Sequence, residues 1–400
     1  MAVKTKANFY RLASCFYYCN KFFGLAAFSY NPTKRKFSES VGSVAYCLLF
    51  LVFTFFFYPY LMYQFLLFLE KSFSTNLGTS IGTFQSLLQW LTLISIQCIN
   101  IYDRKDIVVY YNKKVLYDKK FSSTIPEIYR KKYFLSMLFL ALIVFVFKLL
   151  SGYILMAFIV QKEQNIKPYL IIYLIPSAIT TLTGCSFTME ITCLQFFVTQ
   201  INCSLKKLAV ELVNFPKTSS EAQKMILSCE ISDKIDLFLI FHSDLTKFIA
   251  TFNRLQTRIL LFYFTNKFLE LIIPAFFKYL TIAGLTATTS TADIFANSLF
   301  NDVFNIMELI MMTVCTNSLM NEMSTTAKIL HEFPVHKTDD RLKESINRFS
   351  LQILQEKRPI SVCGMFNVDN TLLYSMISSM TSYLILLVQF QLQGVGSSKG

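Results

Sequence analysis

The 400-residue sequence is 54% hydrophobic and contains 41 Phe, which is more apolar than soluble domains usually are. This composition excludes a soluble globular protein. A formal net charge of +13 suits nucleic-acid binding, but the Lys and Arg residues flank hydrophobic runs and form no basic groove with aromatic residues. Nucleic acid is therefore excluded as a partner, and the composition predicts an all-α membrane protein with several spans.

Seven hydrophobic runs are each long enough to cross a bilayer as a helix, which takes about 20 residues. Their approximate bounds are 41–69, 76–101, 133–160, 169–198, 259–286, 300–323 and 367–391. Pro59, Pro176 and Pro274 fall inside these runs, where we expect them to bend helices.

The orientation follows from the basic residues between the runs. Of the 38 Lys and Arg residues, 31 lie in the segments that one side of the membrane would hold and 4 lie on the other side. This asymmetry places the N-terminus in the cytosol and the C-terminus outside, the reverse of an ordinary G-protein-coupled receptor. The predicted units are a cytosolic N-terminal segment 1–40, spans one to four in 41–198, a cytosolic stretch 199–258, spans five and six in 259–323, a cytosolic stretch 324–366, the last span 367–391, and 392–400 as an extracellular tail or an expression linker.

The two long cytosolic stretches show helical periodicity. Leu205, Leu208 and Leu212 recur at helical spacing, as do Leu342, Ile346, Phe349 and Ile353 after a predicted cap at Asp339 and Asp340. Helices with one apolar face bury it against each other or against neighbouring subunits. A helix lying on the membrane surface is the alternative.

No catalytic constellation is found. His242, His331 and His336 lie far from any Cys pair with zinc-site spacing, and we expect all three to be solvated. The ten Cys fall in spans or on the cytosolic side, where free thiols are expected. The sequence has no phosphate-binding glycine loop and no nucleophile elbow, so we predict neither an enzyme nor a cofactor or metal site.

Ionisable residues inside the spans are costly in lipid and usually face a cavity or a partner. They are Lys148, Glu190, Lys267, Glu270, Lys278, Glu308 and Asp369. We expect Glu190 to make a structural pair near the cytosolic side. Seven residues of the outer half are candidates for an outward-opening ligand pocket: Trp90, Lys148, Tyr173, Thr181, Glu270, Asn305 and Glu308. Bonding from helix to helix is the alternative for each of them.

The last run carries a narrow polar stripe. Ser375, Ser378, Ser382 and Gln389, with Ile385 between them, recur at steps of three and four residues. In hydrocarbon such a stripe must face protein or water. It suits either close helix packing or the wall of a pore.

A family resemblance comes from the same run. Ser382-Tyr383, five apolar residues that include Ile385 and Leu386, and then Gln389-Phe390 resemble the Thr-Tyr, five hydrophobic residues, Gln-Phe signature of insect gustatory receptors. Ser382 stands where that family usually has Thr. Cys363-Gly364-Met365-Phe366 resembles the fructose-sensing branch.

The resemblance implies a ligand-gated, nonselective cation channel of the plasma membrane, a multi-pass homotetramer with a cytosolic anchor domain. The seventh helix would line the pore, with Gln389 and Phe390 at the constriction and Ser378, Ser382, Tyr383, Ile385 and Leu386 leading to it. Its implied partners are a small-molecule tastant, with a sugar favoured, permeating cations, membrane lipids and related receptors that co-assemble. The alternatives are a bitter-compound receptor channel, a non-conducting membrane receptor and a secondary transporter, although no internal repeat supports the last.

Overall fold

A computed structural model describes residues 14, 16–72, 76–125, 132–159, 167–214, 220–282, 291–334, 339–356 and 359–397 of the chain. Nine long helices account for most of them: α2 (Val41–Ser72), α3 (Asn76–Tyr102), α4 (Arg104–Thr124), α5 (Lys132–Ile159), α6 (Lys167–Val213), α7 (Glu221–Ile282), α8 (Thr291–His331), α9 (Asp340–Gln355) and α10 (Asn370–Ser397). The prediction of a mostly helical fold is confirmed.

Two small antiparallel hairpins complete the described elements. Strand β1 (Phe28–Asn31) pairs with β2 (Lys36–Glu39), with Phe28 opposite Glu39. Strand β3 (Ser361–Val362) pairs with β4 (Phe366–Asn367) directly before α10. The β3–β4 turn uses Cys363 and Gly364 at φ of 49° and 71°, a left-handed backbone that Gly adopts without strain.

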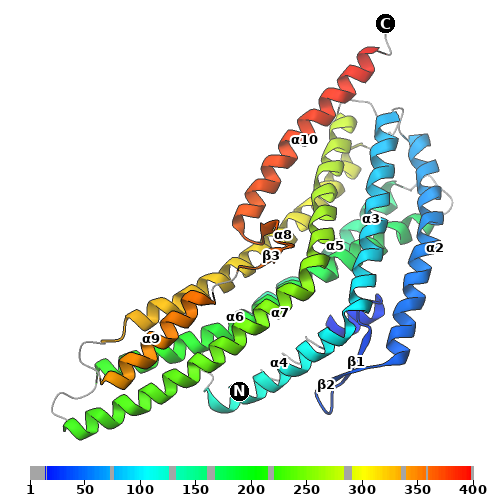
Figure 1. The fold of residues 1–400 in the computed structure, drawn as a ribbon. Helices are drawn as coiled ribbons and strands as arrows, with labels where there is room; N and C mark the ends of the chain where they lie inside the picture. Colours follow the sequence, from blue (N-terminus) through cyan, green and yellow to red (C-terminus); the bar gives the residue numbers. More distant parts are fainter. Residues whose placement is uncertain are drawn as a thin grey trace.

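Three helices are much longer than a bilayer is thick. Helix α7 has 62 residues, so it is about 93 Å long at the helical rise, against about 30 Å of hydrocarbon. Together α6, α7 and α8 form a stem that extends obliquely from the bundle (Figure 1). The unit boundaries predicted after residues 198, 258 and 323 therefore fall inside continuous helices.

Each predicted span lies mainly in one helix. Within the described residues, four helices are long and apolar enough to cross a membrane, with bounds Val41–Gln64, Glu221–Ile282, Ser298–His331 and Asn370–Phe390, and Phe139–Ile154 is a shorter apolar helix. Pro59, Pro176 and Pro274 lie inside α2, α6 and α7. That all seven helices cross a membrane stays a prediction.

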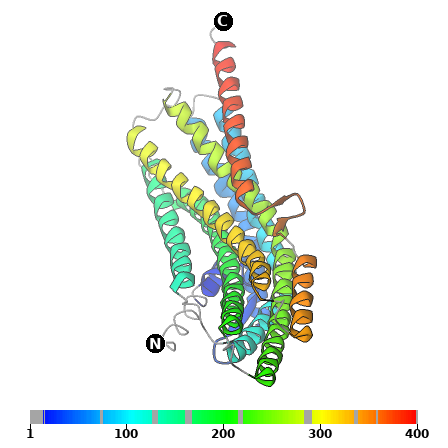
Figure 2. The ribbon, with the colours of Figure 1, turned by 90° about the vertical axis from the view of Figure 1, so that its left-hand side faces the viewer.

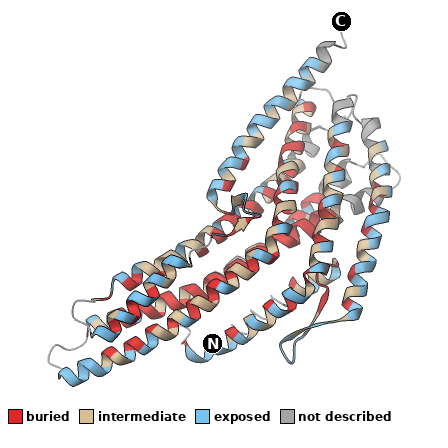
Figure 3. Ribbon diagram, viewed as in Figure 1, coloured by how far each residue is buried: buried red, intermediate tan, exposed pale blue. Residues whose placement is uncertain are grey.

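Helix α6 lies at the centre of the core. It packs on α5, α7 and α8, and the buried residues concentrate on α6 and α7 (Figure 3). Helix α9 packs on α7 and α8 in the stem through Leu342, Ile346 and Phe349, as its periodicity predicted. In both views α9 and α10 lie at opposite ends of the molecule (Figures 1 and 2).

Some local predictions are corrected. Asp339 precedes α9 but makes no side-chain cap hydrogen bond. His242 is only 1% exposed and packs edge-on against Phe349, so its expected solvation is wrong. His242 lies at helical spacing from buried apolar residues of α7, and the sequence analysis did not use this spacing to predict its burial. His331 is exposed as expected, and His336 lies outside the described residues. Residues 392–397 of the predicted tail 392–400 instead continue α10, which ends at Ser397.

Candidate functional site

A buried cluster of charges joins three helices inside the bundle. Lys148 comes from α5, Lys267 and Glu270 from α7, and Glu308 from α8. The Glu308 Oε2 atom lies 3.1 Å from Lys148 Nζ and 2.9 Å from Lys267 Nζ. Glu270 Oε2 lies 2.9 Å from Lys267 Nζ and 3.6 Å from Lys148 Nζ. Two cations and two carboxylates leave the cluster with no net charge, which is what burial requires.

Neutral groups complete the hydrogen bonding of the two carboxylates. Tyr263 donates its hydroxyl to Glu308 Oε1 at 2.8 Å, and Asn266 donates to Glu270 Oε1 at 2.7 Å. Lys267 also donates to Asn305 Oδ1 at 3.2 Å. The arrangement holds α5, α7 and α8 together by charge-assisted bonds in a region with little solvent, where such bonds are strong.

Gly184 of α6 makes room for this cluster. A Cβ atom at that position would lie 2.5 Å from Glu308 Oε1 and 2.8 Å from the Tyr263 hydroxyl. Glycine is needed here for the close approach of side chains from α7 and α8 to the α6 backbone. The sequence contains no signal that separates this glycine from the others.

The candidate pocket residues are only partly brought together. Lys148, Glu270, Asn305 and Glu308 meet in the cluster, where they bond to one another. Trp90 instead donates from Nε1 to the Thr54 carbonyl at 3.3 Å and packs on Phe55. Thr181 is fully buried. The side chain of Tyr173 lies outside the described residues.

Helices α6 and α8 run in the same direction with a constant register. Gln195 donates to Ser318 at 2.7 Å and Thr192 to Cys315 at 3.7 Å, both pairs 123 residues apart. Gly184 and Glu308, which lie close together, are 124 residues apart, and this nearly equal offset places Thr181 near Asn305, about one turn away.

Several buried polar atoms of α6 and α8 have no hydrogen-bond partner among the described residues. They include Ser177 Oγ and Thr181 Oγ1 of α6 and Asn301 Oδ1 of α8, and Gln195 Oε1 farther along α6. An unpaired buried polar atom costs about 1–3 kcal/mol, so a group of them suggests a site that a ligand or water satisfies. Sequence reasoning found Thr181 but missed Ser177 and Asn301, although Ser177 precedes Thr181 by one helical turn.

The other ionisable residues of the predicted spans have structural partners. Glu190 accepts from Tyr110 at 2.5 Å and from Lys114 at 2.6 Å, so its predicted pairing is confirmed. Lys278 pairs with Asp302. Asp369 precedes α10 and caps it, because its Oδ1 accepts from the Thr371 amide at 2.9 Å.

Helix α10 packs through one face and leaves the other open. Leu372 and Met376 are buried against the rest of the chain, whereas Ser375, Ser378, Ser382, Ile385 and Gln389 are all exposed (Figure 3). At about 100° per residue, the polar stripe lies opposite the packed face. Tyr383 contacts Phe268 of α7 edge-on, and Phe390 is 56% exposed.

The described part of the chain contains no group of three or more His, Cys, Asp or Glu placed to hold a metal ion. The nine described cysteines are free thiols, as expected, and Cys15 lies outside the described residues.

Comparison with known proteins gives a family match and a fold match. Residues 13–394 match the model of the 7tm chemosensory receptor family. The chain is 25% identical over 191 residues to the gustatory receptor for sugar taste 43a of Drosophila melanogaster (48% of this chain, 42% of that protein). It is 21% identical over 172 residues to the gustatory receptor for bitter taste 93a of the same species (43% and 40%).

The matched stretches span less than half the length of these curated relatives. Among solved structures, the insect olfactory receptor OR5 from Machilis hrabei superposes with a TM-score of 0.66 at 12% identity. That match covers 96% of this chain and 99% of the receptor. At such low identity the likeness is one of fold.

Proposed function

Because this chain belongs to the 7tm chemosensory receptor family, a family of receptors and not of enzymes, we propose that it is a ligand-gated, nonselective cation channel opened by a small-molecule tastant. The observation that carries the proposal is the open polar face of α10. A lipid-exposed helix would be expected to turn hydroxyl and amide groups inward, yet here they point away from the chain.

The open face has a natural partner in further copies of the same helix. Four α10 helices around an axis would enclose Ser375, Ser378, Ser382 and Gln389, so that water and cations satisfy them. Closed symmetry is the usual result of self-association. The apolar face of α10 would remain on its own subunit.

A matched pair of cysteine variants tests this pore wall. Ser378 lies on the open stripe, and its neighbour Ser379 is half-buried toward the subunit. We expect a water-soluble thiol reagent to block the current of Ser378→Cys and to leave that of Ser379→Cys unchanged. The unmodified chain, with its own free cysteines, provides the background. Equal sensitivity of the two variants would contradict the pore assignment.

The gate is proposed at Gln389 and Phe390. Phe390→Ala removes four rings from the constriction while keeping a good helix former, so the channel should leak without ligand. Gln389→Ala should alter conductance or ion preference more than resting leak. A well-expressed Phe390→Ala channel with background resting current and normal ligand response would exclude Phe390 from the gate.

Assembly is proposed as a homotetramer of the plasma membrane, in which the stem with α9 forms the cytosolic anchor. Exposed apolar residues remain on α9, including Leu351 and Leu354, and contact with a neighbouring subunit would cover them. Four-fold particles in mild detergent are expected. A ligand-responsive monomer would rule this assembly out, and co-expression with related receptors would test co-assembly.

The tastant pocket is proposed along the α6–α8 seam, where Thr181 Oγ1 has no partner among the described residues. Thr181→Val removes that hydroxyl and keeps the shape of the side chain. We expect the ligand concentration for half-activation to rise about fivefold, which corresponds to the loss of one hydrogen bond of about 1 kcal/mol, without loss of stability. Thr180→Val is the matched control, since the Thr180 hydroxyl already donates to the Pro176 carbonyl at 2.9 Å. Equal effects of both changes would argue against the pocket.

A sugar is the proposed ligand class over a bitter compound, because Ser177, Thr181 and Asn301 offer two unpaired hydroxyls and an amide oxygen. The Cys363–Phe366 resemblance carries less weight, since those residues form the β3–β4 turn, where Thr257 accepts from the Cys363 amide at 2.5 Å. Calcium imaging with a panel of sugars and alkaloids separates the two classes. Activation by alkaloids alone would favour the bitter alternative.

A further inference from the structure

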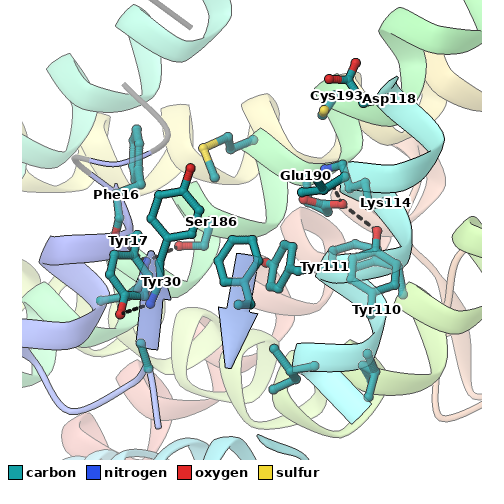
Figure 4. Close-up of a pocket in the computed structure, with 18 of the residues that line it drawn as sticks. Phe16, Tyr17, Tyr30, Tyr110, Tyr111, Lys114, Asp118, Ser186, Glu190 and Cys193 are labelled. Atoms are coloured by element: carbon teal, nitrogen blue, oxygen red, sulfur yellow. Dashed lines mark hydrogen bonds and ion pairs between the residues drawn. The ribbon is translucent and has the colours of Figure 1, made fainter. Parts of the chain in front are cut away.

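A cavity lies between the N-terminal segment with its β1–β2 hairpin and helices α4, α6 and α7. Its volume is about 320 Å³. Figure 4 shows Tyr17 and Tyr30 on one side of it and Tyr110, Tyr111 and Lys114 on the other. None of the candidate tastant residues lines it.

The wall of this inner cavity contains 11 Phe and Tyr residues among the 32 that line it, and it also contains a buried ion pair. Lys114 Nζ lies 2.6 Å from Glu190 Oε1, and the Glu190 side chain is almost fully buried. Burial lowers the pKa of Lys114, but Cys193 and the Glu190 carboxylate outweigh it and raise the pKa overall, so Lys114 stays charged. Glu190 and Cys193 occupy at most two of the three Lys114 donors.

The charges that line the cavity balance. Arg35 and Lys114 are matched by Asp118 and Glu190, so neither a strong anion nor a strong cation is favoured. The remaining Lys114 donor suits an uncharged oxygen acceptor. The rings suit a flat aromatic body, because aromatic pairs gain about 0.5–1.5 kcal/mol beyond their buried area.

The volume limits the size of the ligand. A cavity of about 150 Å³ holds benzene, so about twice that volume takes one or two rings. We propose that this inner cavity is a second small-molecule site that binds a neutral one- or two-ring aromatic compound with its oxygen on Lys114. The site is separate from the tastant pocket.

The cavity shares a segment of α7 with the support of α10. Phe252, Leu255, Gln256 and Ile259 line the cavity, and within the same turns Thr257 donates to the Ser361 carbonyl at 3.2 Å in the hairpin before α10. A ligand that moves this segment would move the base of α10. The prediction that a ligand in the inner cavity modulates the current therefore rests on the proposed channel function, whereas the prediction that the cavity binds a ligand does not.

Binding is tested with 2-naphthol on the full chain in lipid nanodiscs, with empty nanodiscs subtracted. We expect a saturable fluorescence change. Val115→Phe puts a ring into the cavity that Val115 lines and should weaken binding at least tenfold. Leu116→Phe is the matched control, because Leu116 is 67% exposed and does not line the cavity, and it should bind as the unmodified chain does.

A second comparison tests the polar contact. Naphthalene, which has no oxygen, should bind about tenfold more weakly than 2-naphthol. The double variant Lys114→Met with Glu190→Gln leaves no unpaired charge and should abolish that difference. Non-saturable binding, equal binding by both phenylalanine variants, or an undiminished naphthol preference in the double variant would each overturn the proposal.

The current measurement distinguishes this site from the channel proposal. If 2-naphthol shifts the tastant response and Val115→Phe removes the shift, the site is regulatory. If no tastant evokes current although 2-naphthol binds with the expected variant pattern, the channel proposal fails and the inner site stands.

Discussion

Glu308→Gln offers a sharp test of the buried charge cluster. The change keeps the shape of the side chain and removes its charge, so that Lys148 and Lys267 share Glu270 alone. Glu308 is 0% exposed and makes three contacts of 2.8–3.1 Å. If the variant only weakened these three hydrogen bonds, at about 0.6 kcal/mol each as measured for interhelical hydrogen bonds in membranes, the free energy of unfolding would fall by about 2 kcal/mol. An unpaired buried charge costs about 3–5 kcal/mol, and we expect that larger loss.

The double variant Lys148→Met with Glu308→Gln separates the two causes. It restores neutrality and leaves the 2.9 Å pair of Lys267 with Glu270. The free energy of unfolding, measured by SDS titration in mixed micelles, should then fall by less than the sum of the two single losses. The coupling should exceed about 1 kcal/mol, within the range for residues in one network.

Two results would refute this reasoning. A Glu308→Gln loss below about 2 kcal/mol would mean that hydrogen bonds alone explain the site. Strictly additive single and double losses would mean that the two residues do not interact in the folded protein.

Three further predictions concern other parts of the chain. Gly184→Ala should destabilise the detergent-solubilised protein in a thermal assay, because the new Cβ meets Glu308 and Tyr263, whereas an unhindered helical Gly→Ala would stabilise by about 1 kcal/mol. Burial lowers the pKa of His242 to about 4 from its usual 6.5, despite nearby Glu356. Because the folded state keeps His242 neutral, the free energy of unfolding should be at its full value above pH 6.5 and fall by about 3 kcal/mol towards pH 4. A pH profile that does not differ from that of His242→Leu would contradict this. From the charge asymmetry, antibody should reach a C-terminal tag but not an N-terminal tag on unpermeabilised cells; the reverse pattern would overturn the orientation and the channel proposal with it.

The sequence by itself determined the features that follow from local pattern. Hydrophobic run length located the long helices, and the spacing of Leu342, Ile346 and Phe349 predicted the buried face of α9. The polar stripe of α10 was also readable, because the helical period alone places Ser378 and Ser382 on one face. These properties depend on residues within a few turns of each other.

Only the tertiary structure decided which groups meet. Lys148 and Glu308 are 160 residues apart in the sequence. Four of the candidate ligand-binding residues bond to one another in the buried cluster, because the helices that carry them pack in a register that no local sequence pattern encodes. His242 follows the apolar spacing of α7, yet its burial depends on Phe349 of α9. The inner cavity needs the N-terminal segment to lie on α4 and α6. Periodicity identifies the face a helix buries, but the partner for that face is selected by packing across the whole chain.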